Sequence, residues 1–239
     1  FLSKKAEYKV RLLYKEEIRT CGKDAKNIVS LGTAGFVMQL TNSLVSICCN
    51  NVLSATGGDV YVSVMTIISS VRQMIETPIW SISEGSSLVI SYNYGAKRPK
   101  KVIEAWITMS VLALIYSLIA WSVILFAPKF LIGIFSSDKS LMIDTVPAMK
   151  LYFSAFIFML FQYTGQTMFK SLNKKKQAIF FSILRKVIIV VPMTYMFPYV
   201  FHMGSNGVFM AEPVSNVIGG SLCFIVMLLT VLPELKQMN

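Results

Sequence analysis

Six long apolar runs follow one another along the chain, and the polar residues gather in the short stretches between them. A helix needs about 20 apolar residues to cross the roughly 30 Å hydrocarbon core of a bilayer. The pattern therefore predicts an all-α polytopic membrane protein. The six predicted spans are residues 27–53, 60–92, 102–126, 141–169, 177–201 and 208–232.

The second run is unusual because it carries ionisable side chains inside apolar sequence, among them Arg72, Glu76 and Glu84. At 100° per residue, its polar residues fall within an arc of roughly 120°, and its Val and Ile residues take much of the other side. Ionisable groups at membrane depth normally face a cavity or a partner. The pattern indicates either the wall of a translocation pathway or a structural ion pair between Arg72 and Glu76 that joins two helices.

Polar stripes in the first and fourth runs have the same two interpretations, a cavity wall or hydrogen bonding between helices. For Met159 alone, ordinary core filling is the simpler interpretation. We predict a substrate and ion pathway lined by residues of the first, second and fourth spans. These residues are Gln39, Asn42, Ser43, Ser46, Asn50, Arg72, Gln73, Glu76, Trp80, Glu84, Tyr152, Met159, Gln162 and Gln166.

Charges also occur in the last two runs. Arg185 and Lys186 lie about two helical turns from Lys176, and we expect them to reach the cytoplasmic headgroups as anchors. Glu212 is a weaker candidate than Glu76 for an acid that couples ion movement to transport.

The net charge of +11 suggests nucleic-acid binding until the charges are placed along the chain. Most of the 23 Lys and Arg residues lie in the N-terminal segment, the second and fourth connections and the tail, whereas the alternate connections hold only Lys129 and Lys139. This asymmetry predicts a multi-pass protein of the cell membrane with both termini cytoplasmic and no nucleic-acid partner. Residues 1–26 are predicted to be a cytoplasmic or interfacial linker that contacts membrane lipid or is simply solvated, and residues 233–239 a cytoplasmic tail.

The remaining composition argues against an enzyme. The chain is 54% hydrophobic, its mean hydropathy is +0.60, and it contains four Cys without C-x-x-C spacing and one His. A membrane enzyme would need clustered His, Cys or paired acids at one interface, so we expect no enzymatic activity, metal or cofactor. Because the first residue is Phe1, we expect the chain to be a fragment or domain of a longer protein.

The end of the second span carries a recognisable pattern: Pro78, then Ser83-Glu84-Gly85, then Ser91-Tyr92-Asn93-Tyr94-Gly95-Ala96-Lys97. This pattern resembles the multidrug and toxic compound extrusion (MATE) family, and its DinF-type bacterial branch in particular. Further support comes from Leu31-Gly32 and Gln39-Leu40, from Gly57-Gly58-Asp59, and from Arg185 and Pro192.

The resemblance implies the second half of a twelve-helix transporter, in which two six-helix lobes surround a cleft. Such proteins export cationic or amphipathic compounds in exchange for Na⁺ or H⁺. The missing N-terminal lobe or a second copy of the chain would then complete the cleft. Two alternatives remain open at this point: a lipid-linked saccharide flippase of the same superfamily, and a half-transporter that does not transport.

Overall fold

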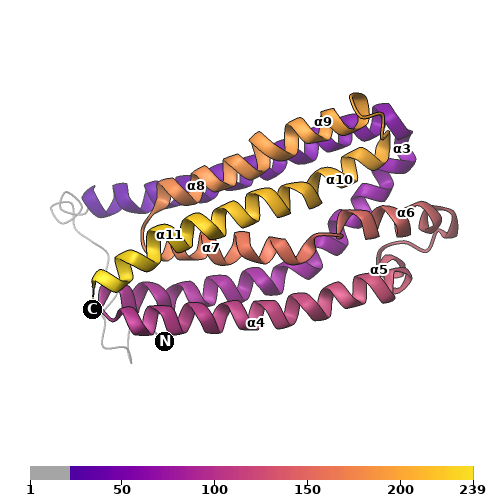
Figure 1. Cartoon of the computed structure of the whole chain (residues 1–239). Helices are drawn as coiled ribbons and strands as arrows, with labels where there is room; N and C mark the ends of the chain where they lie inside the picture. Colours follow the sequence, from indigo (N-terminus) through magenta and orange to yellow (C-terminus); the bar gives the residue numbers. More distant parts are fainter. Residues whose placement is uncertain (1–21, 239) are drawn as a thin grey trace, which may run out of the picture. The chain divides into compact units, whose positions relative to one another are not determined.

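The computed structural model describes residues 22–238, and between residues 22 and 38 it describes the side chains only in part. Most of the predicted linker, residues 1–26, lies outside this range. The account below concerns residues 38–238, which form one unit, and residues 22–37 belong to a separate unit. The described chain is helical. Its helices, shown in Figure 1, are α3 (Gly22–Gly95), α4 (Pro99–Phe126), α5 (Pro128–Phe135), α6 (Lys139–Tyr152), η1 (Phe156–Phe158), α7 (Met159–Ser171), α8 (Lys175–Ile183), η2 (Leu184–Val190), α9 (Val191–Tyr199), α10 (Ser205–Ser215), η3 (Asn216–Gly220) and α11 (Ser221–Gln237).

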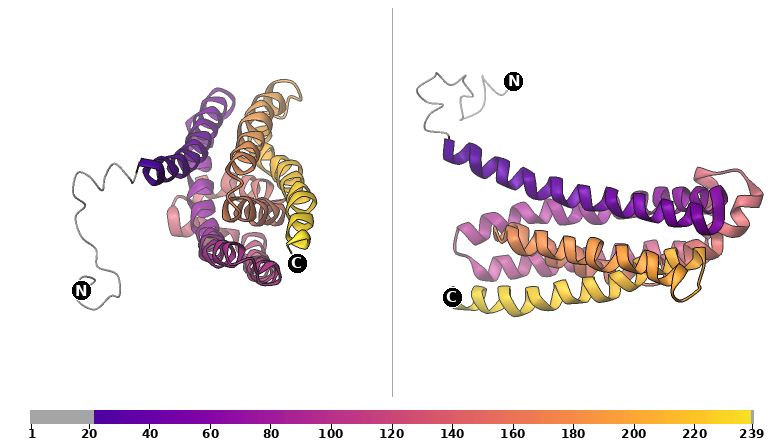
Figure 2. Two further views of the ribbon diagram at one scale, coloured as in Figure 1. Left: turned by 90° about the vertical axis from the view of Figure 1, so that its left-hand side faces the viewer. Right: turned by 90° about the horizontal axis from the view of Figure 1, so that it is seen from above.

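Gly58 divides α3 into two helices. Its φ of 69° and ψ of −168° are not helical, and this combination is accessible essentially to glycine alone. Residues 38–57 and the part of α3 after Gly58 run in opposite directions (Figures 1 and 2). A single stretch of helical sequence, interrupted only at Gly58, therefore folds back on itself as two helices.

Among the described residues, four helical segments are long and apolar enough to cross a membrane: Gln39–Gly95, Pro99–Phe126, Lys175–Tyr199 and Ser205–Gln237. A fifth is the pair Lys139–Tyr152 and Phe156–Ser171, which is bent by 48°. Gly58 divides the first of these segments into two helices that run in opposite directions. The all-α membrane fold is as the sequence predicts.

The second half of α3 buries its apolar side in the protein core. Ile68, Val71 and Ile79 are fully buried, and the cluster they belong to also contains Tyr152 and Phe209. The polar side of the same helix therefore faces away from this apolar core. This orientation follows from the 3.6-residue repeat of apolar positions, and it places Arg72 and Glu76 at the edge of the core.

Two glycines allow the helices on the other side of the bundle to approach closely. A Cβ on Gly207 of α10 would lie 2.8 Å from the backbone of Phe197 and Pro198 in α9. A Cβ on Gly220 would lie 2.6 Å from the carbonyl oxygen of Phe158. The first glycine lets α10 approach α9, and the second lets η3 approach η1. Further contacts join α10 to α6, α11 to α7 and α8 to α7.

Candidate functional site

A cavity of about 450 Å³ opens between both halves of α3 and the elements α6, α7, η2 and α10. Its apolar walls include Val45, Met65, Val190 and Val208. Its polar walls include amides, hydroxyls and four charged side chains. The charged ones are Arg72, Glu76, Lys186 and Glu212. The cavity can therefore accommodate a compound that is partly apolar and partly charged.

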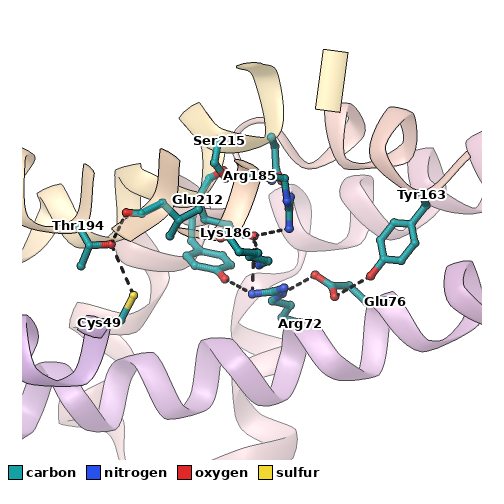
Figure 3. A network of polar contacts seen from close by, with 12 residues as sticks. Cys49, Arg72, Glu76, Tyr163, Arg185, Lys186, Thr194, Glu212 and Ser215 are labelled. Atoms are coloured by element: carbon teal, nitrogen blue, oxygen red, sulfur yellow. Dashed lines mark hydrogen bonds and ion pairs between the residues drawn. The ribbon is translucent and has the colours of Figure 1, made fainter. Parts of the chain in front are cut away.

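Arg72 is held on the cavity wall by Glu76 and Tyr152, and Glu76 is held in turn by Tyr163. Its Nε donates to Glu76 Oε1 on the next turn of α3, and its Nη1 donates to the Tyr152 hydroxyl at 2.8 Å. The Tyr163 hydroxyl donates to Glu76 Oε2 at 3.2 Å (Figure 3). Because α6 and α7 each supply one of these tyrosines, the ion pair on α3 is fixed from two sides.

Glu212 of α10 is the second anionic centre of the site. Its Oε1 accepts hydrogen bonds from Arg185 Nη2 at 3.2 Å and from Lys186 Nζ at 3.1 Å, and it forms an ion pair with Arg72 Nη1 at 3.7 Å (Figure 3). Arg185 also donates to the side-chain oxygen of Asn216. The side chains of Arg185, Lys186 and Glu212 are almost completely buried, with 6%, 7% and 6% exposed.

We call these five side chains the ion cluster: Arg72, Glu76, Arg185, Lys186 and Glu212. It joins α3, η2 and α10, and it contains three cations and two carboxylates. Buried charges are tolerated when opposite charges and hydrogen bonds compensate them. The cluster therefore fixes the three elements relative to one another and also presents charge to the cavity.

The local backbone explains how two neighbouring cations reach the same interior. Arg185 and Lys186 lie in η2, and Asn216 begins η3. Both segments are π-helical, with backbone bonds from i to i+5, and such segments occur frequently at functional sites. Gly219 makes room for the arginine, since a Cβ there would lie 2.8 Å from Arg185 Cγ.

The structure brings together eight of the fourteen residues predicted for the pathway. The eight that line the cavity are Gln39, Asn42, Ser46, Arg72, Gln73, Glu76, Trp80 and Tyr152.

Six other predicted residues do not line this cavity. Met159 is buried in the apolar core, as ordinary core filling predicts, and Gln162 is buried as well. Gln166 donates to the carbonyl oxygen of Ala178 at 3.3 Å. Glu84 forms an ion pair with Lys170. The remaining two, Ser43 and Asn50, are exposed on α3. A role for these six in the pathway stays a prediction.

The predicted anchoring role of Arg185 and Lys186 is wrong. Both side chains are buried against Glu212 rather than directed to the headgroups. Position 185 lies about 14 Å along the helix from position 176. At that depth Arg185 pairs with the neighbouring Glu212 carboxylate instead of extending to the headgroups. Two more residues that line the cavity are absent from the predicted pathway: Glu212, expected only as a weaker candidate than Glu76, and Tyr163, which the sequence pattern does not single out. A charge deep in each of two apolar runs was the sequence signal that could have paired Glu212 with Lys186.

The MatE family model matches residues 35–196. Among solved structures, the chain is similar to a MATE transporter in complex with MaL6, with 20% identity and a TM-score of 0.85 over 99% of this chain and 52% of the other. It is similar to the outward-facing form of a multidrug resistance MATE transporter of the MOP superfamily, with 20% identity and a TM-score of 0.82 over 90% and 48% of the two chains.

A third similar structure is a MOP superfamily transporter from Pyrococcus furiosus, described as having a binding pocket of reverse polarity that suggests a different function. Identity is 20% and the TM-score 0.83, over 99% of this chain and 52% of the other. No curated protein matches the sequence. The chain thus spans about half the length of the transporters whose fold it shares.

Proposed function

This chain belongs to the MatE family, and on that premise we propose that it supplies one lobe of a secondary active exporter that works by alternating access. Members of the family are transporters rather than enzymes. Since the chain spans about half of the solved transporters, a further lobe or a second copy of the chain would supply the facing wall of the cleft. The proposed location is the cell membrane, with both termini cytoplasmic.

The observation that carries this proposal is the cavity with mixed walls. Apolar side chains such as Met65 and Val208 border it together with Arg72 and Glu76. Ionisable residues at membrane depth mark substrate and ion pathways, and apolar walls suit amphipathic compounds. We propose cationic or amphipathic small molecules as substrates and Na⁺ or H⁺ as the coupling ion, with Glu76 as the group that exchanges the ion.

The test is transport by the full natural protein in lipid vesicles. A Na⁺ or H⁺ gradient is imposed, and the movement of a fluorescent amphipathic dye is followed. Dye should accumulate against its own gradient only while the ion gradient lasts. Dye movement that depends on neither the Na⁺ gradient nor the H⁺ gradient would contradict secondary transport. It would favour a half-transporter without transport activity.

One observation favours a second function, the flipping of lipid-linked saccharides. Arg185 and Lys186 add two buried cations beside Arg72, and the phosphate of a lipid carrier is anionic. Such a flippase would move a labelled polyprenyl-phosphate sugar from one leaflet of a vesicle to the other. An exporter of soluble compounds would leave that lipid in its original leaflet.

A further inference from the structure

With all five side chains ionised, the ion cluster carries one more positive than negative charge. Glu212 neutralises one charge, although three cations share its Oε1 at 3.1, 3.2 and 3.7 Å. Glu76 neutralises a second and is already occupied by Arg72. An uncompensated charge is costly at membrane depth, and such a charge is stabilised when an opposite charge binds beside it.

Two of the three cations face the cavity. Arg72 and Lys186 both line it, whereas Arg185 is buried behind them against Glu212 and Asn216. A guanidinium carries five N–H donors and an ammonium three. The observed bonds of Arg72 use its Nε and Nη1, and that of Lys186 uses its ammonium once. Donors therefore remain to bind acceptor oxygens inside the cavity.

We propose that the cavity binds a single negatively charged group, a carboxylate or a phosphate, between Arg72 and Lys186, and that the rest of the ligand is apolar. The apolar part would lie against Val45, Val190 and Val208, which share the cavity. This inference rests on the proposed transport function and, of the substrates proposed there, selects the amphipathic compounds that carry an acidic group. The same chemistry belongs to soluble acids and to anionic lipids.

The test compares two probes of equal chain length and opposite charge, decanoate and decyltrimethylammonium. The full natural protein is placed in nanodiscs of phosphatidylcholine, and binding is followed by the fluorescence of Trp80, which lines the cavity and is 55% exposed. A Trp80→Phe variant gives the background signal of all the remaining tryptophans, Trp106 and Trp121 of this chain among them. Decanoate should bind about tenfold more tightly or better, the ratio expected for one charged hydrogen bond.

Two variants should move this preference in opposite directions. Lys186→Gln removes a cavity cation and should abolish the preference for decanoate. Glu76→Gln removes a cavity anion and should strengthen it, so the test survives if the lysine variant fails to fold. Lys101→Gln makes the same substitution at an exposed ion pair with Glu104 and should change nothing. Tighter binding of the cation, or a ratio that neither variant alters, would overturn the inference.

Competition identifies the source of the negative group. Displacement of decanoate by polyprenyl phosphate built into the nanodisc would support a lipid ligand, and undisturbed decanoate binding would support a soluble acid. Transport separates this inference from the function on which it rests. Decanoate binding without gradient-driven transport would refute the exporter and leave the anion site. Gradient-driven export of decyltrimethylammonium without decanoate binding would refute the anion site and leave the exporter.

Discussion

Glu212 is the carboxylate that all three cations of the ion cluster share. Its carboxylate contacts cations from α3 and η2, and the Ser215 hydroxyl donates to its backbone oxygen at 2.8 Å. Removing one partner from a buried ionic network leaves the others without compensation, and this is strongly destabilising. The stability of the bundle should therefore be sensitive to this single carboxylate.

The substitution Glu212→Gln should destabilise the protein by about 3–5 kcal/mol, because Arg185 and Lys186 would remain buried without their anion. Thermal unfolding in detergent measures the change. Glu104→Gln is the matched control, since that glutamate is 64% exposed and pairs with an exposed lysine, and it should cost about 1 kcal/mol or less. Equal melting temperatures for the two variants would contradict a structural role for Glu212.

The substitution Glu76→Gln should abolish gradient-driven transport and leave expression intact. An amide cannot exchange a proton or attract a cation as a carboxylate does, but it retains hydrogen-bonding groups for Arg72 and Tyr163. Dye export by vesicles and the protein level in the membrane are the two measurements. Transport at the wild-type rate would remove Glu76 from the coupling mechanism.

The sequence predicted Arg72 and Glu76 correctly as neighbours on one helix face because α3 keeps an ordinary helical repeat there. The prediction for Arg185 and Lys186 failed because it rested on their distance from Lys176 along the helix, and that distance does not show that a carboxylate lies beside them in the interior. Their partner Glu212 lies in another helix, and one-dimensional periodicity does not show which helices touch. The pairing becomes visible only when α10 is placed against η2.

At the scale of the elements, small residues decide how closely helices pack. Gly220→Ala would place a Cβ 2.6 Å from the carbonyl oxygen of Phe158, a backbone atom that cannot move alone. Overpacking of this kind costs about 1–3 kcal/mol. We expect a lower melting temperature for this variant.

Gly133→Ala is the control, because open space surrounds that position in α5 and alanine favours helix by up to about 1 kcal/mol. It should leave the melting temperature unchanged or raise it slightly. A Gly220→Ala variant as stable as this control would show that η3 and η1 are not packed as described.

Hydropathy predicted the all-α membrane fold correctly, since long apolar runs leave few alternatives. It did not predict α5, because residues 128–140 were interpreted as a connection and a run of eight residues has no clear period. It also did not predict the bend of the fourth crossing between α6 and α7. That break depends on local geometry near Phe153 and Phe156, which are buried among neighbouring helices.

At the scale of the whole molecule, the distribution of basic residues predicts an orientation. Lys100, in the second connection, should face the cytoplasm, and Lys139, in the third, the outside. Both are exposed. In a variant of the full protein whose native cysteines are replaced by serine, Lys139→Cys should react with an impermeant maleimide added to intact cells. Lys100→Cys should react only after the cells are opened. The reverse pattern would invert the proposed topology.

The left-handed glycine at position 58 has a consequence for how the chain enters a bilayer. The 74 residues of α3 would form a rod of about 110 Å as one straight helix, more than three times the thickness of the hydrocarbon layer. A residue with a side chain would be strained at this φ and ψ, so the chain would be less able to reverse direction at position 58. Without the reversal, part of the apolar helix would extend beyond the membrane into water. We expect the two halves of α3 to insert together as one helical hairpin. Gly58 permits this because it has no Cβ and can adopt the positive φ that the turn requires.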